Sequence, residues 1–255
     1  MRVTAILNNK GGVGKTVTAT NVAAILARIH DKRVLVVDAD SQGNTTEFFG
    51  VDGSMREGFA AMLRRKATGD PAATTAVKGV DLISGDDTLM DLDLSSIKTA
   101  EADPSCLKRY LAEAGERWDY VLIDCPPAFN AAAAAALLAA DDVVIPVKLD
   151  AFSLRGMTNL MRQVKNMAKI NPQLRVAGVL PTMFRAEEAI FDAERKLRES
   201  GLPVFPHIRA SSKVDVSTFQ QRPLIYSSPT SAATVDYKRF VTRYMTQKGG
   251  VHDGV

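Results

Sequence analysis

The chain has 255 residues, of which 46% are hydrophobic and 24% charged, and this balance is typical of a soluble globular protein. It contains no apolar stretch of the roughly 18–20 residues that span a bilayer and no N-terminal signal, so we expect neither a membrane span nor secretion. The two cysteines, Cys106 and Cys125, form no C-x-x-C pair, which indicates a reducing cytoplasm and argues against a zinc or disulfide framework.

The first elements of the chain predict a phosphate-binding loop. An apolar run at 3–7 leads into residues 8–16, Asn-Asn-Lys-Gly-Gly-Val-Gly-Lys-Thr, and an amphipathic run at 17–29 follows. This strand–loop–helix order lets glycine backbone N–H groups approach a polyphosphate at the positive end of a helix. Lys15 is expected to reach the β- and γ-phosphates, and the Thr16 hydroxyl to hold Mg²⁺.

The loop departs from the common pattern G-x-x-x-x-G-K-[ST] at its first position and carries an additional lysine. Asn9 stands where that pattern has glycine, and a second lysine, Lys10, follows it. Two lysines on one short loop are not expected to serve the same phosphates equally. We therefore interpret Lys10 as a cation for the transferring phosphoryl group, delivered from a neighbouring subunit as an arginine finger is.

The rest of the chain alternates between short apolar runs and amphipathic helical patterns. We expect strands at 34–37, 80–83, 120–123, 143–147, 176–180 and 204–205. We expect helices at 54–66, 104–115, 131–140, 153–170, 187–199 and 232–245, an irregular basic stretch at 207–228 and a disordered tail at 248–255. This order predicts one domain, residues 1–247, with a doubly wound, mostly parallel α/β sheet flanked by helices, of the P-loop NTPase type.

The run at 131–140 is almost entirely alanine and leucine, a composition that forms helices readily. Its small side chains would permit close approach either to the sheet or to a second subunit. Packing in the core is the simpler interpretation, and we expect it here.

Carboxylates follow two of the predicted buried strands. Asp38 and Asp40 follow the strand at 34–37, and Asp124 follows Tyr-Val-Leu-Ile in a Walker B arrangement. Carboxyl ends of parallel strands form the ligand-binding edge of an open sheet. Asp124 is therefore expected to hold Mg²⁺ directly or through water, while Asp38 and Asp40 are candidates for orienting the attacking water.

The motif Lys-Gly-Gly-x-Gly-Lys-Thr at 10–16 is a deviant Walker A loop, and on it the chain resembles the ParA/MinD (Soj-like) family of partition and positioning ATPases. Residues 38–44 match the family's Asp-x-Asp-Pro-Gln-Gly-Asn except for Ser41, and residues 124–127 are close to its Asp-Cys/Thr-Pro-Pro. Val17 stands where the family commonly has threonine.

The resemblance implies an ATP- and Mg²⁺-dependent hydrolase with slow basal turnover. It implies an ATP-bound sandwich homodimer in which Lys10 contacts nucleotide across the interface. Catalysis would rest on Lys10, Lys15 and Asp40, and the metal site on Thr16, Asp38 and Asp124. The implied nucleotide contacts are Lys10, Gly11, Gly12, Val13, Gly14, Lys15, Thr16, Val17, Met183 and Pro206.

Charge is distributed unevenly, because residues 1–150 carry 16 Lys/Arg and 21 Asp/Glu, whereas residues 151–255 carry 16 and 8. The basic C-terminal part predicts a polyanion contact, against the alternative of scattered solvated side chains. The candidates for non-specific DNA contact are Arg162, Lys165, Lys169, Arg209, Lys213, Lys238, Arg239 and Arg243. The family's basic Pro-Arg-Ser-Arg-Gly-like turn reads Pro-Thr-Ser-Ala-Ala at 229–233, so any DNA surface must use other residues.

The leading hypothesis is a cytoplasmic, nucleoid-associated ParA-type ATPase that segregates a plasmid, phage or chromosomal locus marked by a ParB-like protein. A MinD-type positioning ATPase needs a C-terminal amphipathic helix, which the tail at 248–255 cannot form. An electron-transfer ATPase like the nitrogenase reductase needs suitably placed thiolates, and Cys106 and Cys125 do not match that need. A metabolic ATP-dependent ligase on the same fold is a further alternative.

Overall fold

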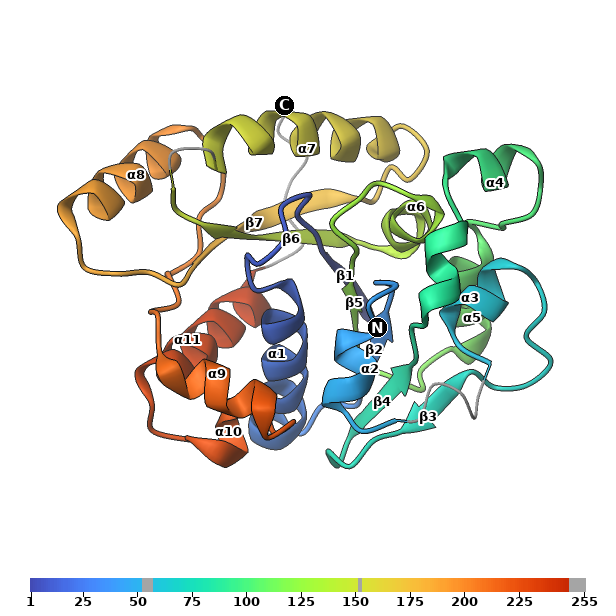
Figure 1. The fold of residues 1–255 in the computed structure, drawn as a ribbon, viewed down its shortest axis with the longest axis horizontal. Coiled ribbons are helices and arrows are strands. Elements are labelled where there is room, and N and C mark those ends of the chain that lie inside the picture. Colours follow the sequence, from blue (N-terminus) through green and yellow to red (C-terminus); the bar gives the residue numbers. More distant parts are fainter. Residues whose placement is uncertain (52–56, 151–152, 248–255) are drawn as a thin grey trace.

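The structure is a computed structural model that describes residues 1–51, 57–150 and 153–247. Its centre is a seven-stranded sheet in the order β3-β4-β2-β5-β1-β6-β7 (Figure 1). The strands are β1 (Arg2–Ile6), β2 (Val34–Asp38), β3 (Ala72–Thr74), β4 (Val80–Ile83), β5 (Tyr120–Asp124), β6 (Asp142–Lys148) and β7 (Arg175–Thr182). Adjacent strands pair in parallel except for β3, which runs antiparallel to β4 at the edge.

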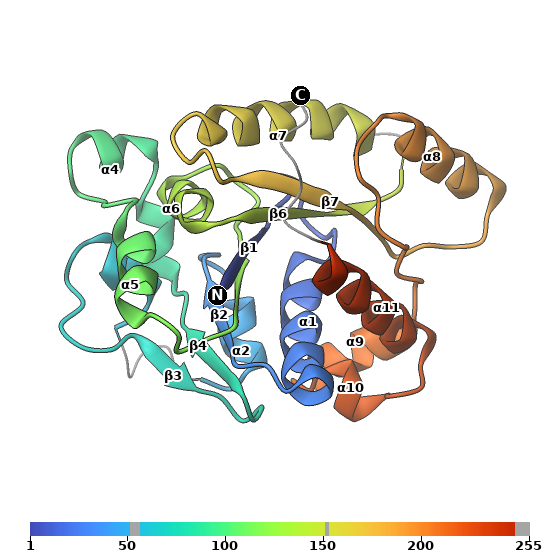
Figure 2. The same cartoon turned by 180° about the vertical axis from the view of Figure 1, so that it is seen from behind.

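Helices cover both faces of the sheet, and each face has its own apolar core. One core packs under α1 (Lys15–His30), α2 (Asn44–Phe48), α10 (Leu224–Ser227) and α11 (Ala232–Thr246), with α9 (Ser212–Phe219) beside them. The other packs under α3 (Phe59–Leu63), α5 (Cys106–Ala114), α6 (Ala131–Ala139), α7 (Ser153–Ala168) and α8 (Glu188–Glu199). Figures 1 and 2 show α7 and α11 on opposite sides of β6 and β7.

This architecture confirms the predicted doubly wound, mostly parallel sheet. The main strands and helices fall within a few residues of the predicted ranges. The alanine-rich helix α6 is buried from Ala131 to Leu137 within the core, as expected. No helix of the described ranges combines the length and apolarity needed to cross a membrane.

The sequence interpretation was wrong in some local elements. The stretch at 207–228 is not irregular, because Ser211 caps α9 by accepting a hydrogen bond from the Lys213 N–H and Pro223 precedes α10. The run at 204–205 forms only a single bridge to β7, at Val179, and is not a strand. Four short elements were missed: α2, β3, the 3₁₀ turn η2 (Asp87–Asp91) and α4 (Leu94–Lys98). The predicted helix 54–66 is described only as α3, and the tail at 248–255 lies outside the described residues.

A buried carboxylate ties the last helix to the base of the sheet. Asp142 begins β6 and is fully buried, and it accepts hydrogen bonds from Arg2 Nε at 2.5 Å and Tyr244 Oη at 2.8 Å. Arg175 Nη2 lies 2.7 Å from its other oxygen. These partners come from β1, β7 and α11, so one buried carboxylate connects three elements to β6.

We expect Asp142→Ala to lower the free energy of unfolding by about 3–5 kcal/mol, because it leaves two guanidinium groups beside a buried site without their counter-charge. Urea denaturation measures this change. The matched control is Asp192→Ala, which removes the exposed pair with Arg195 on α8 and should cost less than about 1 kcal/mol. Equal losses in the two variants would contradict the structural role of Asp142.

Candidate nucleotide site

The predicted phosphate loop connects β1 to α1 as an open cradle. Gly12 and Gly14 adopt positive φ angles of 69° and 85°, a region that favours glycine. Apart from the adjoining residues of the loop, no atom of the described residues lies within 4 Å of where a Cβ would stand on Gly11 or Gly12. The base of the loop is fixed, because the Thr182 hydroxyl donates to the Val13 carbonyl at 2.8 Å.

The helix that follows presents its N-terminus to this cradle. Gly14 is the N-cap of the 16-residue helix α1, and no side chain caps it. No acidic residue occupies the first turn. Backbone N–H groups and the positive end of the helix dipole are therefore available to an anion.

The two lysines of the loop have different surroundings. Lys15 is buried, and its ammonium donates to the Lys10 carbonyl at 3.3 Å. The Lys10 side chain is partly exposed and pairs with the carboxylate of Asp150, just after β6. Lys15 thus lies within the cradle, whereas Lys10 lies outside it on an ion pair within its own chain.

Three sequence-predicted metal residues meet at the carboxyl edge of the sheet. Asp38 and Asp124 are directly paired across neighbouring strands β2 and β5. Thr16 Oγ1 donates to Asp124 Oδ2 at 2.7 Å, and Thr45 Oγ1 donates to the same oxygen at the same distance. Within the described part of the chain, the buried Asp124 Oδ1 has no hydrogen-bond partner.

The electrostatics of this pair favour a cation. Burial raises the pKa of Asp38 well above its usual value, and the neighbouring Asp124 raises it further. Burial likewise raises the pKa of Asp124, although the Thr16 and Thr45 hydroxyls oppose that shift. Two buried carboxylates with one orphaned oxygen form a donor set that suits a hard divalent cation such as Mg²⁺.

Asp40 belongs to the loop after β2, which hydrogen bonds hold in place. Its carboxylate accepts the Gln42 N–H at 3.1 Å, and its own N–H donates to Asp38 Oδ1 at 3.3 Å. Asp38 Oδ2 accepts both the N–H and the hydroxyl of Thr46, at 2.8 and 2.7 Å. The N–H of Gly85 donates to that hydroxyl at 2.9 Å. The loop after β2 is therefore fixed by α2 and by the turn after β4.

A cavity of about 450 Å³ opens beside the cradle and could hold the base and sugar of a nucleotide. Gly14 and Val17 line it from the loop and the start of α1, Met183 from just after β7, and Tyr237 from α11. Its further lining comes from Lys148, Thr182, Arg185, Ile208, Arg209, Ala210, Ser211, Ser212, Val214 and Asp215. Pro206, predicted as a nucleotide contact, is not among these residues and lines a separate cavity.

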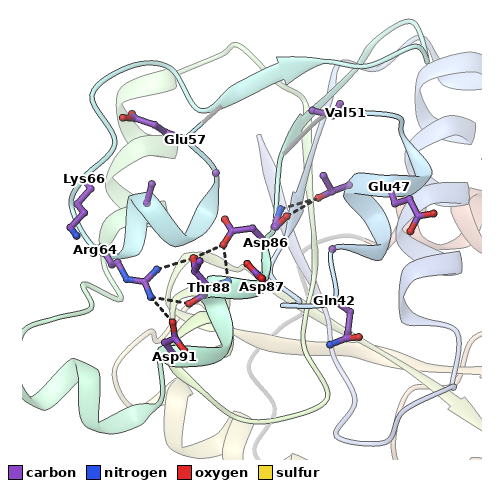
Figure 3. Close-up of a pocket in the computed structure, with 15 residues that line it drawn as sticks. Gln42, Glu47, Val51, Glu57, Arg64, Lys66, Asp86, Asp87, Thr88 and Asp91 are labelled. Carbon is purple, nitrogen blue, oxygen red and sulfur yellow. Dashed lines mark hydrogen bonds and ion pairs between the residues drawn. The ribbon is translucent and has the colours of Figure 1, made fainter. Parts of the chain in front are cut away.

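A further cavity, of about 850 Å³, lies elsewhere, and residues 8–16 do not line it (Figure 3). Gln42, Gly43 and Thr46 form its wall toward the Asp40 loop. Figure 3 shows Arg64 reaching Thr88 and Asp91 across the opposite side. This space lies behind the Asp40 loop and is distinct from the phosphate cradle.

The candidate DNA residues do not form one surface. Arg162, Lys165 and Lys169 are exposed on or just after α7, on one side of the sheet. Lys238, Arg239 and Arg243 lie on α11, on the other side, with Arg209 and Lys213 in the preceding segment. The helical spacing of the α7 residues was visible in the sequence, but their separation from α11 depends on how the chain crosses the sheet.

Sequence reasoning missed several contributors to the site. Thr45 and Thr46 hold the two buried carboxylates, and Asp150 pairs with Lys10. Gly85 lies close to the Asp38 and Asp40 carbonyls, which is possible only because it has no side chain. Thr45 and Thr46 could have been recognised from the sequence, because two hydroxyl side chains directly follow Gly43-Asn44. Asp150 and Gly85 are distant in the sequence and reach the site only through the fold.

Comparisons with known proteins agree with this geometry. The family model described as AAA domain matches residues 1–176. The chain is 35% identical to Chromosome partitioning protein ParA of Caulobacter vibrioides over 200 residues, 77% of this chain and 74% of the relative. It is 34% identical to Chromosome-partitioning ATPase Soj of Thermus thermophilus over 254 residues, 97% of this chain and 96% of the relative.

Among solved structures, the chain is similar to cobyrinic acid a,c-diamide synthase from Mycobacterium smegmatis with bound ATP analogue and magnesium. The TM-score is 0.82 at 28% identity, covering 96% of this chain and 94% of that one.

We expect Gly85→Ala to destabilise the fold by about 1–3 kcal/mol, because its Cβ would stand 2.7 Å from the Asp38 carbonyl and 2.9 Å from the Asp40 carbonyl. Urea denaturation measures the change. Gly69→Ala is the matched control, since the described residues beyond its chain neighbours place no atom within 4 Å of its Cβ position, and it should change stability by less than about 0.5 kcal/mol. A Gly85→Ala protein as stable as this control would show that the loop is not braced as described.

Proposed function

Because the chain belongs to the ParA/MinD family of P-loop ATPases and its curated relatives are ParA/Soj partitioning proteins, we propose that it is an ATPase that segregates DNA. The observation that carries the mechanism is the different placement of the two loop lysines. Lys15 lies buried in the phosphate cradle, whereas Lys10 stays outside it on Asp150. One chain therefore holds the nucleotide, and a second chain supplies the additional cation.

The phosphate end of the site would be built from this chain's own groups. The N–H groups of the loop and the N-terminus of α1 would bind the β- and γ-phosphates, and Lys15 would turn from the Lys10 carbonyl toward them. Thr16 and Asp124 would hold Mg²⁺, with Asp38 supporting that shell through its place beside Asp124. Bound Mg²⁺ supplies charge neutralisation to the β- and γ-phosphate oxygens.

Asp40 is the candidate for orienting the attacking water. It is buried, its loop is fixed by Asp38 and Gln42, and it lies at the same sheet edge as the metal residues. Its carboxylate would accept a hydrogen bond from that water and hold it toward the γ-phosphate. Basal turnover is expected to be slow and dependent on Mg²⁺, because a lone chain lacks the second cation.

The surface near Thr16 supports a two-molecule assembly. Phe219, at the end of α9, is 90% exposed and lines a cavity shared with Thr16 and Phe48. An exposed phenylalanine beside a phosphate site is suited to contact with another chain. On dimerisation, Lys10 would leave Asp150 and reach across to the partner's nucleotide.

The cycle follows from this arrangement. ATP binding would produce the dimer, the dimer would hold non-specific DNA, and a ParB-like centromere-binding partner would stimulate hydrolysis and reset the protein. We place it in the cytoplasm, with the ATP-bound form on the nucleoid. An ATP-dependent ligase is the second candidate, favoured by the likeness to cobyrinic acid a,c-diamide synthase, and it would turn over ATP with a small substrate and no DNA.

A complementation experiment tests whether the second cation comes from another chain. We expect Lys10→Gln and Asp40→Ala, each alone, to lower the ATPase rate by about 10²–10³, since each removes one group that acts in the transition state. Asp40→Ala should remain an ATP-bound dimer by light scattering. An equal mixture of the two should recover activity, because each mixed dimer holds one site with Asp40 in its own chain and Lys10 from the other.

If Lys10 acts on the nucleotide of its own chain, no mixed dimer contains a complete site and the mixture stays inactive. An equal mixture of Asp192→Ala and wild type controls for the effect of mixing two proteins. Its activity should equal that of wild type, because Asp192 is exposed on α8, outside the proposed site. An Asp40→Ala protein that remains monomeric at saturating ATP would also contradict the proposal.

A further inference from the structure

Asn9, which stands where the common phosphate-loop pattern has glycine, joins the loop to helix α7. Its Nδ2 donates to Gln163 Oε1 at 2.9 Å, across 154 residues of sequence. Among the described side chains of α7, Gln163 alone hydrogen-bonds the loop. The residue that replaces glycine therefore gives the loop a connection to a helix on the far side of β6.

The Asn9 side chain has no second partner among the described residues. Its Oδ1 is buried and accepts no hydrogen bond. The bond to Gln163 is thus the one described interaction that holds this amide in place. Because an unpaired amide inside a protein costs free energy, loss of Gln163 would let the Asn9 side chain turn toward water.

Gln163 stands on a rigid support. It is partly buried on α7, and its neighbours on the same helix, Leu160, Val164 and Met167, are buried in the core. A side chain carried by a packed helix is held more precisely than one carried by a loop. Gln163 can therefore fix the position of whatever it binds.

Lys10 takes its position from the two residues before it. Its N–H donates to Asn8 Oδ1 at 2.9 Å, and Asn8 Nδ2 donates to the Pro146 carbonyl on β6 at 2.7 Å. Asn9 adds the connection to Gln163 on α7. The backbone at Lys10 is thus tied to the sheet by one asparagine and to a helix by the other.

The other described contacts of Lys10 would be lost in the proposed cycle. Its carbonyl accepts from the Lys15 ammonium, which would turn to the phosphates. Its own ammonium pairs with Asp150, which it would leave for the partner's nucleotide. Asn8 and Asn9 are then the described supports that remain, so the position of Lys10 at the moment of reaction depends on them.

We propose that Gln163 is a positioning residue for the second cation: through Asn9 it holds the Lys10 backbone where the side chain can reach the partner's nucleotide. This rests on the proposed function. Gln163 acts through these two residues and not on the nucleotide itself. Its loss would spread Lys10 over more positions and slow the reaction, while the chain's own phosphate cradle stays intact.

The first test separates turnover from nucleotide binding. Gln163→Leu keeps the size of the side chain and removes its hydrogen-bonding group. We expect it to lower kcat about tenfold and to leave the Kd for Mg²⁺·ADP within about twofold of wild type. An unchanged kcat would overturn the inference, and so would an equal loss in kcat and in ADP affinity, which would place Gln163 in the cradle.

Asn166→Ala is the matched control on the same helix. Asn166 is exposed about one turn beyond Gln163, and the described contact of its side chain is with Lys169. This variant should leave kcat and the Kd for Mg²⁺·ADP unchanged. A tenfold loss of kcat in Asn166→Ala would show that α7 tolerates no change, and the specific role of Gln163 would fall.

The second test asks whether Gln163 acts through Lys10. In a Lys10→Gln background, Gln163→Leu should lower kcat less than about twofold further, because the group that it positions is already gone. An equal mixture of Gln163→Leu and Asp40→Ala should recover activity, since the Asp40→Ala chain supplies a well-placed Lys10 to the site that keeps Asp40. A mixture of Gln163→Leu and Lys10→Gln should not recover. A full tenfold loss in the Lys10→Gln background, or recovery in the last mixture, would overturn the inference.

A readout without turnover separates the failure of this inference from that of the proposed function. In the ADP-bound chain, ¹⁵N relaxation should show an ordered Lys10 N–H in wild type and a mobile one in Gln163→Leu. Asn9→Ala removes the same bond from the loop side, should give the same result and replaces Gln163→Leu if that protein does not fold. A wild-type chain that hydrolyses no ATP would overturn the proposed function, whereas an unchanged Lys10 N–H in both variants would overturn only the present inference.

Discussion

The site depends on two carboxylates that the sheet forces side by side. Asp38 and Asp124 end neighbouring parallel strands in direct register, and both are buried. Burial favours the protonated form of both carboxylates, and the charge of Asp124 adds to this effect at Asp38, which is why their pKa values rise. Hydroxyls from Thr16, Thr45 and Thr46 offset part of that cost. The orphaned Asp124 oxygen shows that the protein alone does not satisfy the pair, and a divalent cation with a polyphosphate would complete it.

The same constraint explains how remote parts of the chain reach the site. Asp38 is held by α2 through Thr46, and Thr46 is held by the turn at Gly85. Asp124 is held by the first turn of α1, where the phosphate cradle ends. A change in the cradle, in α2 or in the turn after β4 therefore acts on one carboxylate pair. We propose that the nucleotide and the cation meet at this carboxylate pair, where the three connections converge.

Much of this could be predicted from contiguous patterns. The glycine loop, the buried strands and the carboxylates directly after them are local signals, because strand ends in a parallel sheet gather at one edge. What could not be predicted depends on contacts between distant segments. The resemblance assigned Pro206 to the nucleotide; in the structure Pro206 and His207 line one cavity, whereas Ile208, Ala210 and Ser211 line the cavity beside the phosphate cradle. The basic residues of α7 and α11 were grouped by charge, although the sheet lies between them.

The most direct test of the carboxylate pair is anomalous scattering from Mn²⁺ in crystals grown with a non-hydrolysable ATP analogue. We expect a single peak at the end of β5, about 2.1 Å from Thr16 Oγ1 and from the analogue's phosphate oxygens, with Asp124 as a direct ligand or one water away. A nucleotide bound in the cradle with the metal elsewhere, or with Asp124 still unpartnered, would contradict it.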